Sequence, residues 1–323
     1  LRGELPTSVQ LASMESELQA ARVLPAPIYD VIRVVRSAHP MDVLRTAVSA
    51  LAAFDPEVAD NTPEATLRKG IRLTAQVPMI VTAHEHIRNG REPVAPDPKL
   101  GHAANFLYML KGKAPGADAA KLMDTDMILH AEHGSNASSF TARVVAGTEA
   151  NLHAAITAAV AALSGPAHGG AAENVMKMAM EIGDASKAAG YVRNKRANKE
   201  PVMGFGHRVY RAEDPRARHM RAGVEKLSRE MGQPQWYQIL EALVDAMHPY
   251  ARHGVNVNVD FYAGVVYYLN GIAEDLFVPI FAVGRVPGWT VQVLEQMENN
   301  ILIRPLTLYN GPDARAYVPI AQR

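Results

Sequence analysis

Three ionisable residues, His168, His207 and Asp260, stand in segments whose composition is unusual for a helix core or an ordinary loop. Glycines surround both histidines, in Gly165–Gly170 and Gly204–Arg208, and two asparagines shortly precede the aspartate. Two imidazoles and one carboxylate can supply an acid, an electrophile and a base for chemistry beside a carbonyl group. These residue types therefore predict an enzyme.

The segment around His168 follows an apolar stretch and contains glycines that allow a backbone to approach a ligand closely. A helix is expected to begin soon after it, and the free N–H groups of that helix can bind an anion or keep the imidazole neutral. A turn with an incidental histidine explains the same residues. The segment is not a Walker loop, because no Lys-Ser or Lys-Thr pair follows the glycines.

Gly204 and Gly206, before His207, form only a weak echo of a dinucleotide-binding motif, because Val209 stands where a third glycine is needed. A loop that binds a nucleotide through its backbone and a plain loop between helices both remain open. Asp260 precedes an apolar helical stretch. It is expected to cap that helix, to hold a carboxylate at the edge of a pocket, or to do both.

Further polar residues stand at breaks in the helical pattern. His130 and His133 are three residues apart and can share a helix face, as metal ligands do, but no third ligand is evident. A hydrogen bond to a polar substrate is the other interpretation. His84 and His86 are too close together to share a helix face and are expected on a solvated surface.

Arg216, Arg285 and Arg304 each lie next to a loop signal. Arg285 stands in the apolar run from Phe277 to Trp289, where an unpaired charge is costly. It is therefore expected to meet a carboxylate, either from the protein as a salt bridge or from a ligand.

Helices must position these residues, because apolar side chains recur at helical spacing through most of the chain. The expected helices include Asp214–Met231, with the aspartate as N-cap, Ala172–Ser186 and Gln235–Met247. Asn151–Leu163 is apolar nearly all round, which is typical of a helix buried among others. Convincing strand alternation is absent, so the fold is predicted to be all-α, with room for a short hairpin in the loops.

The composition bounds the function classes. The chain has 323 residues, 48% hydrophobic and 20% charged, which suits one large domain or two smaller ones. A formal net charge of zero argues against a nucleic-acid partner. The absence of cysteine excludes disulfides, thiolate nucleophiles and cysteine zinc sites, and fits a cytoplasmic protein. No segment approaches about 18 consecutive apolar residues, so no membrane span is expected.

Together these segments resemble the citrate synthase family. The likeness runs from Leu1–Thr7 to Ile301–Pro305 and includes Gly-Pro-Ala-His-Gly-Gly, Gly-Phe-Gly-His-Arg-Val-Tyr, Asp-Pro-Arg and Asn-Val-Asp-Phe-Tyr in the family's order. It implies an all-α fold of two domains, a large one formed by residues 1–164 and 265–323 and a small mobile one formed by residues 165–264. It also implies an obligate homodimer, domain closure, and further N-terminal elements before those seen here.

The resemblance implies that the chain condenses acetyl-CoA with oxaloacetate and water to give citrate and CoA, the first step of the tricarboxylic acid cycle. Asp260 resembles the base that removes a proton from the acyl methyl group. His168 resembles the residue that hydrogen-bonds the thioester oxygen as the enolate forms. His207 resembles the residue that polarises the keto group of oxaloacetate and protonates the new alkoxide.

The resemblance also implies two sets of binding residues and no metal. His133, Arg216, Arg285 and Arg304 are similar to the residues that hold oxaloacetate and citrate, with the last acting across the dimer interface. CoA is a co-substrate and not a permanently bound cofactor. Its expected contacts are Val202, Met203, Gly204, Phe205, Gly206, Arg211 and Asn258.

Three alternatives remain open at this point. A 2-methylcitrate synthase would use propionyl-CoA, and one added methylene changes binding by only about 1–3 kcal/mol, so the sequence barely separates the two. A non-catalytic paralogue that binds CoA or oxaloacetate is a second alternative. A metal-dependent hydrolase is the third, and it would lose activity with a chelator.

Overall fold

The computed structural model describes residues 4–323, so Leu1–Gly3, where the resemblance begins, lie outside it. Within the described residues the chain forms α-helices joined by loops and short 3-10 turns, and no strand, which confirms the all-α prediction. Phe205 and Val257 form an isolated antiparallel bridge between two loops. The α-helices are α1 (Ser8–Ala20), α2 (Ala26–Val34), α3 (Pro40–Leu51), α4 (Pro63–Arg88), α5 (His102–Lys111), α6 (Ala117–His130), α7 (Ala137–Ala146), α8 (Leu152–Leu163), α9 (Ala171–Ile182), α10 (Ala188–Ala197), α11 (Ala217–Glu230), α12 (Gln235–Met247), α13 (Asp260–Leu269) and α14 (Phe277–Glu298).

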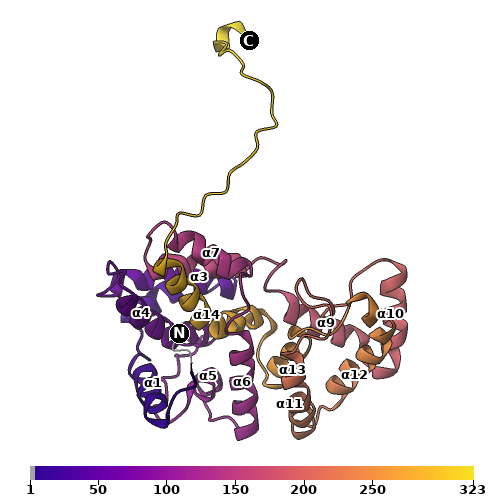
Figure 1. The fold of residues 1–323 in the computed structure, drawn as a ribbon. Coiled ribbons are helices and arrows are strands. Elements are labelled where there is room, and N and C mark those ends of the chain that lie inside the picture. Colours follow the sequence, from indigo (N-terminus) through magenta and orange to yellow (C-terminus); the bar gives the residue numbers. More distant parts are fainter. Residues whose placement is uncertain (1–3) are drawn as a thin grey trace.

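Helix α14 is the core of the larger group of helices. It is apolar on most sides and packs against α4, α6, α7 and α8 (Figure 1). With the turn before it, Glu274–Glu298 is long and apolar enough to cross a membrane by composition, but 89% of its most apolar window is buried inside the protein, as in a core helix. Gly288 approaches the Ala131 carbonyl so closely that a Cβ would overlap it, which fixes α14 against the end of α6.

Helices α9 to α13 gather on the other side of the molecule from α3, α4 and α5 (Figure 1). Helix α13 packs against α9 and α11, and α12 packs against α10. Helix α13 also contacts α6, so the group formed by α9 to α13 meets the group around α14 at these two helices. The loops at this meeting carry the residues that the sequence singles out.

Helix ends agree with the sequence where local signals decide them. Helix α12 has the predicted bounds, and α8 begins after Asn151, whose side chain accepts a hydrogen bond from Ala154 N at 3.0 Å. Helix α9 is shorter than predicted. It ends at Ile182 and not at Ser186, because Gly183 adopts a left-handed conformation (φ +66°) that closes the helix.

The predicted N-cap role of Asp214 is wrong. Helix α11 begins at Ala217, and Asp214 is fully buried two residues before Arg216 at its N-cap. The carboxylate accepts hydrogen bonds from Arg216 N at 3.0 Å and from Val259 N at 3.3 Å. It therefore joins the loop before α11 to the loop before α13, which a helix-capping signal cannot reveal.

Residues 300–323 leave the helical body as an extended tail that ends in a short 3-10 turn (Figure 1). Apolar side chains in it stand almost fully in solvent, including Leu306 at 92% and Leu308 at 94% exposure. Arg304 lies in this tail and is exposed.

Candidate active site

One cavity of about 810 Å³ collects residues that are far apart in the sequence. The loops after α6 and α8, the segment before α11, the start of α13 and the middle of α14 all contribute to it. The lining includes all three predicted catalytic residues and three of the four predicted oxaloacetate ligands. The predicted residues that line it are His133, His168, Gly206, His207, Arg216, Asp260 and Arg285.

His168 lies between α8 and α9, and its ring reaches the N-terminus of α7. Ser138 N donates to His168 Nε2 at 3.2 Å, and the Ser138 hydroxyl lies 2.9 Å from the same nitrogen. Because Nε2 accepts, the ring proton rests on Nδ1 and leaves an N–H donor for a ligand. Burial and the charge of Arg285 lower the pKa of His168, which keeps the ring neutral near pH 7.

The sequence led us to expect that α9, the next helix, would supply this contact with His168. Helix α7 supplies it instead. The Asn136 side chain caps α7 by accepting from Ser139 N at 3.2 Å, which leaves the preceding N–H, that of Ser138, free to reach the imidazole.

His207 is fixed by the loop that follows it. The backbone N–H groups of Val209 and Tyr210 donate to Nδ1 at 3.0 and 3.3 Å, so the neutral ring carries its proton on Nε2. Burial lowers the pKa of His207. The ring meets His133 edge to face, with centroids 5.0 Å apart, and His133 Nε2 lies 3.0 Å from the Tyr210 hydroxyl. Burial and the charge of Arg216 lower the pKa of His133 to about 4, so this ring is also neutral.

Asp260 is the first residue of α13, Val259 occupies the N-cap position, and no side-chain hydrogen bond caps the helix. The predicted capping role is therefore wrong. Asp260 is partly buried, and its side chain lines the cavity. Desolvation raises the pKa of Asp260, although the positive charges of His130 and Arg216 oppose this. A carboxylate with a raised pKa is a stronger base than an exposed one.

Arg285 is 2% exposed, and its guanidinium lies over the Phe281 ring, 4.6 Å from the centroid. Its Nε donates to the carbonyl of His130, whereas its buried Nη1 has no partner among residues 4–323. Burial lowers its pKa to about 10, which leaves it charged at neutral pH. No salt bridge joins it to a carboxylate among the described residues, so the salt bridge that the sequence allowed is not formed.

Arg216 already has a protein carboxylate. Its Nε and Nη2 donate to the two oxygens of Asp214 at 3.0 and 2.7 Å, which fixes the plane of the guanidinium beside the cavity. Arginine has five N–H donors, so three remain for other acceptors.

The segment Val202–Gly206 pairs with the stretch that precedes α13. Gly206 N donates to Asn256 O at 2.7 Å, Asn258 N donates to Gly204 O at 2.9 Å, and Asn258 Nδ2 donates to Gly206 O at 3.0 Å. Gly204 has φ +78° and almost no free space, since a Cβ there would lie 2.5 Å from a Phe261 side-chain atom. The Asn258 side chain therefore holds the shape of this loop.

The other residues predicted to contact CoA or oxaloacetate lie away from the cavity lining. Val202 is buried, Met203 and Phe205 are partly exposed, and Arg211 is exposed. Arg304 lies in the extended tail, so this chain does not bring it to its own cavity.

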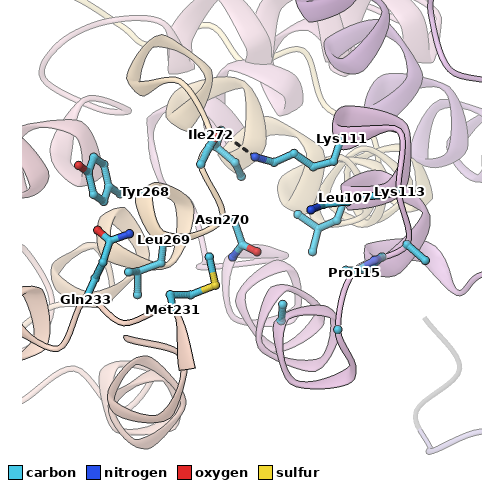
Figure 2. Close-up of a pocket in the computed structure, with 14 residues that line it drawn as sticks. Leu107, Lys111, Lys113, Pro115, Met231, Gln233, Tyr268, Leu269, Asn270 and Ile272 are labelled. Atoms are coloured by element: carbon cyan, nitrogen blue, oxygen red, sulfur yellow. Dashed lines mark hydrogen bonds between the residues drawn. The ribbon is translucent and has the colours of Figure 1, made fainter. Parts of the chain in front are cut away.

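A second cavity, of about 670 Å³, lies at the opposite ends of α6 and α13 (Figure 2). Lys111 and Lys113 stand on one wall, Met231 on another, and Lys111 Nζ donates to Gly271 O at 2.9 Å. Its lining contains neither a histidine nor a carboxylate. It lacks the imidazoles and the carboxylate that line the first cavity, so the first cavity is the candidate active site.

Within residues 4–323, no three His, Asp or Glu side chains lie close enough together to hold a metal ion. His130 and His133 do not converge. The ring of the first pairs with Asp126 and that of the second meets Tyr210.

Sequence reasoning missed residues that act on the predicted ones. Ser138 orients one imidazole, Tyr210 contacts His133, and Asp214 fixes Arg216. The short spacing in Asp-Pro-Arg is a signal for the contact between Asp214 and Arg216. Ser138 and His168 are 30 residues apart, so their contact has no local signature.

The chain is similar to proteins of one known family. Residues 1–306 match the family model described as "Citrate synthase, C-terminal domain". Citrate synthase 2 of Bacillus subtilis (strain 168) is 44% identical over 99% of this chain and 86% of its own length. The 2-methylcitrate synthase 1 of Corynebacterium glutamicum is 41% identical over 99% of this chain and 85% of its length.

A solved structure agrees. The ternary complex of citrate synthase from Thermoplasma acidophilum with carboxymethyl coenzyme A and oxaloacetate superposes with a TM-score of 0.91 at 31% identity, covering 100% of this chain and 86% of that one. The chain therefore belongs to the citrate synthase family, whose enzymes are transferases that condense acetyl-CoA with oxaloacetate.

Proposed function

We propose that this chain is a citrate synthase that condenses acetyl-CoA with oxaloacetate and water to give citrate and CoA, the entry step of the tricarboxylic acid cycle. One observation carries the proposal. A single cavity is lined by a carboxylate of raised pKa, Asp260, and by two neutral imidazoles, His168 and His207, each with its tautomer set by backbone N–H donors.

The chemistry assigns each group one task. The Asp260 carboxylate removes a proton from the acyl methyl group, and His168 Nδ1–H stabilises the oxygen charge of the forming enolate. The enolate carbon attacks the keto carbon of oxaloacetate, while His207 Nε2–H polarises the keto oxygen and gives its proton to the alkoxide. Water then hydrolyses the thioester, which releases citrate and the CoA thiol.

Oxaloacetate is a dianion, and the cavity offers two guanidinium groups for it. Arg285 has an unpartnered nitrogen in a buried position and Arg216 is held in a fixed plane, which suits bidentate recognition of carboxylates. His133 is a further donor beside His207. These features support oxaloacetate as the second substrate.

CoA is proposed to lie along the Val202–Gly206 loop, with Arg211 and Asn258 nearby. The Thermoplasma acidophilum structure holds a CoA analogue together with oxaloacetate, which supports the same pair of ligands here. No permanently bound cofactor is needed for the steps above.

The assembly is proposed to be a homodimer in which Arg304 reaches the cavity of the second copy. The extended tail, with its exposed apolar residues and this arginine, supports the idea because such a segment gains by burying against another surface. Mixing Arg304→Ala with an inactive Asp260→Asn variant tests it. Activity that returns in the mixed sample supports an Arg304 that acts across the interface. A mixture that is no more active than the two variants measured separately contradicts it.

Residues 165–264 are proposed as the small domain that closes on the large domain of residues 1–164 and 265–323. Closure would exclude water before condensation, because early hydrolysis of the thioester would waste the acyl group. The absence of cysteine fits the proposed cytoplasmic location.

A 2-methylcitrate synthase is the second candidate, because relatives with that name are 41–42% identical to this chain. Steady-state rates with acetyl-CoA and propionyl-CoA, each with oxaloacetate, separate the two. The released CoA thiol can be read with a thiol reagent without background, because the chain has no cysteine. A higher kcat/KM for acetyl-CoA supports the proposal. A clear preference for propionyl-CoA replaces it with the second candidate.

A further inference from the structure

Behind the cavity lies a buried chain of polar groups that the proposed mechanism does not use. The Tyr267 hydroxyl donates to Asp126 Oδ2 at 2.6 Å, and the other oxygen of Asp126 lies 3.2 Å from His130 Nδ1. All three residues are at most 1% exposed. Tyr267 comes from α13, and the two others come from α6.

The charge balance of this group needs a cation. A buried carboxylate is costly unless it is paired and hydrogen-bonded, and Tyr267 supplies a hydrogen bond but no charge. Among residues 4–323 the only salt bridge to Asp126 comes from His130. Protonation of His130 completes the pair, and its edge contact with the Phe281 ring, 4.6 Å between centroids, tolerates a cation.

His130 also has a free end. Its Nε2 is buried and has no hydrogen-bond partner in the described chain. Helices α6 and α13 contact each other and run antiparallel, since the start of α6 and the end of α13 line the same cavity. Tyr267, which contacts Asp126, stands two turns after Asp260 on α13, and His130 stands one turn after Asp126 on α6, so His130 lies towards the start of α13, where Asp260 is. On α14, Arg285 Nε donates to the His130 carbonyl.

We infer that Asp126 and His130 are positioning residues that form a buried carboxylate–imidazolium pair, and that the positive end of this pair holds Asp260 as a carboxylate ready to accept a proton. The inference rests on the proposed function, in which Asp260 is the base.

The electrostatics agree with the geometry. Burial lowers the pKa of His130, but the charge and hydrogen bonds of Asp126 outweigh burial, so the net shift is upward. For Asp260, desolvation raises the pKa and His130 is the strongest opposing group, ahead of Arg216, while Asp126 acts in the raising direction. Without the imidazolium, the base would hold its proton to a higher pH.

The test is the pH dependence of kcat/KM for the acyl-CoA at saturating oxaloacetate. In His130→Gln the acid limb is expected to move up by about one pH unit or more, because an opposite charge at short range shifts a carboxyl by roughly 1–3 units. In Asp126→Asn the limb moves up by less, because the variant also removes a negative charge that opposes ionisation of Asp260. Tyr267→Phe changes no charge and moves it least.

His84→Gln is the matched control, since His84 is also a buried histidine (1% exposed) and its Nε2 lies 3.0 Å from the Arg36 carbonyl, outside the cavity lining. Its acid limb is expected to coincide with that of the wild type. An unshifted limb in His130→Gln, or an equal shift in the control, overturns the inference.

A second measurement does not depend on activity or on the stability of the His130 variant. The Cε1–H resonance of His130 in the wild-type protein is expected to report an imidazolium at pH 7.5 and to become neutral in Asp126→Asn. A neutral ring in the wild type overturns the inference even if the enzyme is active. If instead neither acyl-CoA releases thiol, the proposed function fails, and this resonance still decides the charge of the pair.

Discussion

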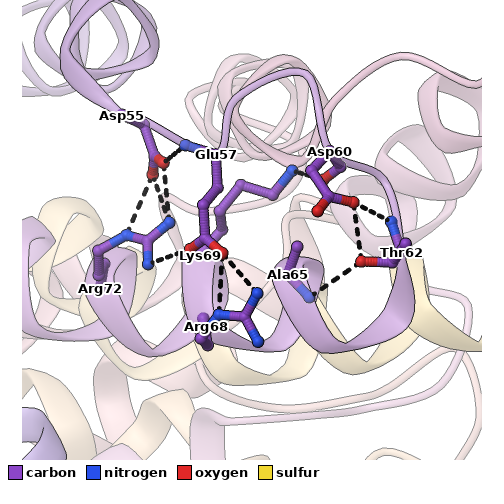
Figure 3. Close-up of polar contacts among 8 residues, drawn as sticks. All are labelled: Asp55, Glu57, Asp60, Thr62, Ala65, Arg68, Lys69 and Arg72. Atoms are coloured by element: carbon purple, nitrogen blue, oxygen red, sulfur yellow. Dashed lines mark hydrogen bonds and ion pairs between the residues drawn. The ribbon is translucent and has the colours of Figure 1, made fainter.

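Two clusters of charged side chains differ in how completely the protein itself neutralises them. At the turn before α4, Arg72 donates to both oxygens of Asp55 and to Glu57, and Arg68 donates to Glu57 (Figure 3). At the cavity, by contrast, Arg285 is more deeply buried and keeps a nitrogen without any partner among the described residues. We call a cluster closed when its charges are paired within the protein, and open when a buried charge keeps an unpaired donor. A closed cluster stabilises a fold, whereas an open one is suited to an ionic ligand.

The carboxylates of the two clusters show the same contrast. Hydrogen bonds from Arg68 and Arg72 lower the pKa of Glu57 to about 2, whereas desolvation raises the pKa of Asp260. The first group is held as an anion at every ordinary pH. The second is poised to exchange a proton, which is what a base must do.

The largest expected effect is on turnover, in Asp260→Asn. Loss of the base is expected to lower kcat by a factor of roughly 10² to 10⁴, because general-base catalysis contributes about that much. Oxaloacetate binding, measured by calorimetry, is expected to survive. Asp118→Asn, which changes an exposed carboxylate paired with Lys226, serves as the control. Wild-type kcat in the first variant would refute the role of Asp260.

The next effect concerns the donor for the enolate oxygen. His168→Ala is expected to lower kcat by about 10²- to 10³-fold, as found when one donor to a developing oxyanion is removed. The KM for oxaloacetate should change little, because that substrate is assigned to the arginines. A variant that instead raised this KM with kcat intact would move His168 from the acyl side of the cavity to the oxaloacetate side.

A crossed pair of arginine variants tests the comparison itself. Arg285→Met is expected to raise the KM for oxaloacetate by about 10-fold or more, since a hydrogen bond to a charged group contributes roughly 1.5–3 kcal/mol, and to leave Tm nearly unchanged. Arg72→Met is expected to lower Tm by several degrees, at about 2–4 °C per kcal/mol, with KM unchanged. The reverse assignment of the two effects would break the distinction between closed and open clusters.

The smallest expected effect is a difference between the pH at which activity is lost and the pH at which the fold is lost. Activity needs Asp260 ionised, so it should fall on acidification through a pKa that lies above that of an ordinary aspartate. Glu57 has a lowered pKa of about 2, so its contribution to stability is fully present above the pKa of an unfolded glutamate and is lost as the pH falls towards 2. Activity is therefore expected to disappear while circular dichroism still reports native helix. Coincident loss of both would argue against this order.

Much of the fold could be predicted from local patterns, because helix periodicity and caps are local. Asn151 begins α8 through a hydrogen bond of its side chain, and Gly183 ends α9 through its left-handed backbone conformation. Asp214 misled the prediction because it stands outside helix α11, where its carboxylate bonds Arg216 and also Val259, 45 residues away. Tertiary hydrogen bonds override a capping preference in such cases.

The candidate site divides in the same way. The apolar run around Arg285 predicted a charge in need of a partner, and its Nη1 has none among the described residues. The close approach of a ligand at the glycines around His168 stays a prediction. The identity of the helix that orients His168, and the link from Asp126 to Tyr267 across 141 residues, have no local signature. The buried positions of His84 and His86, which were expected in solvent, also depend on distant carbonyl partners.

In the proposed mechanism one carboxylate and two neutral imidazoles meet around the reacting carbons. The most direct test is a crystal structure of this protein with oxaloacetate and a non-reactive acetyl-CoA analogue. We expect the keto oxygen within about 3.2 Å of His207 Nε2 and the analogue's carbonyl oxygen within the same distance of His168 Nδ1, with Asp260 beside the methyl-equivalent carbon. Ligands bound away from these three side chains would contradict it.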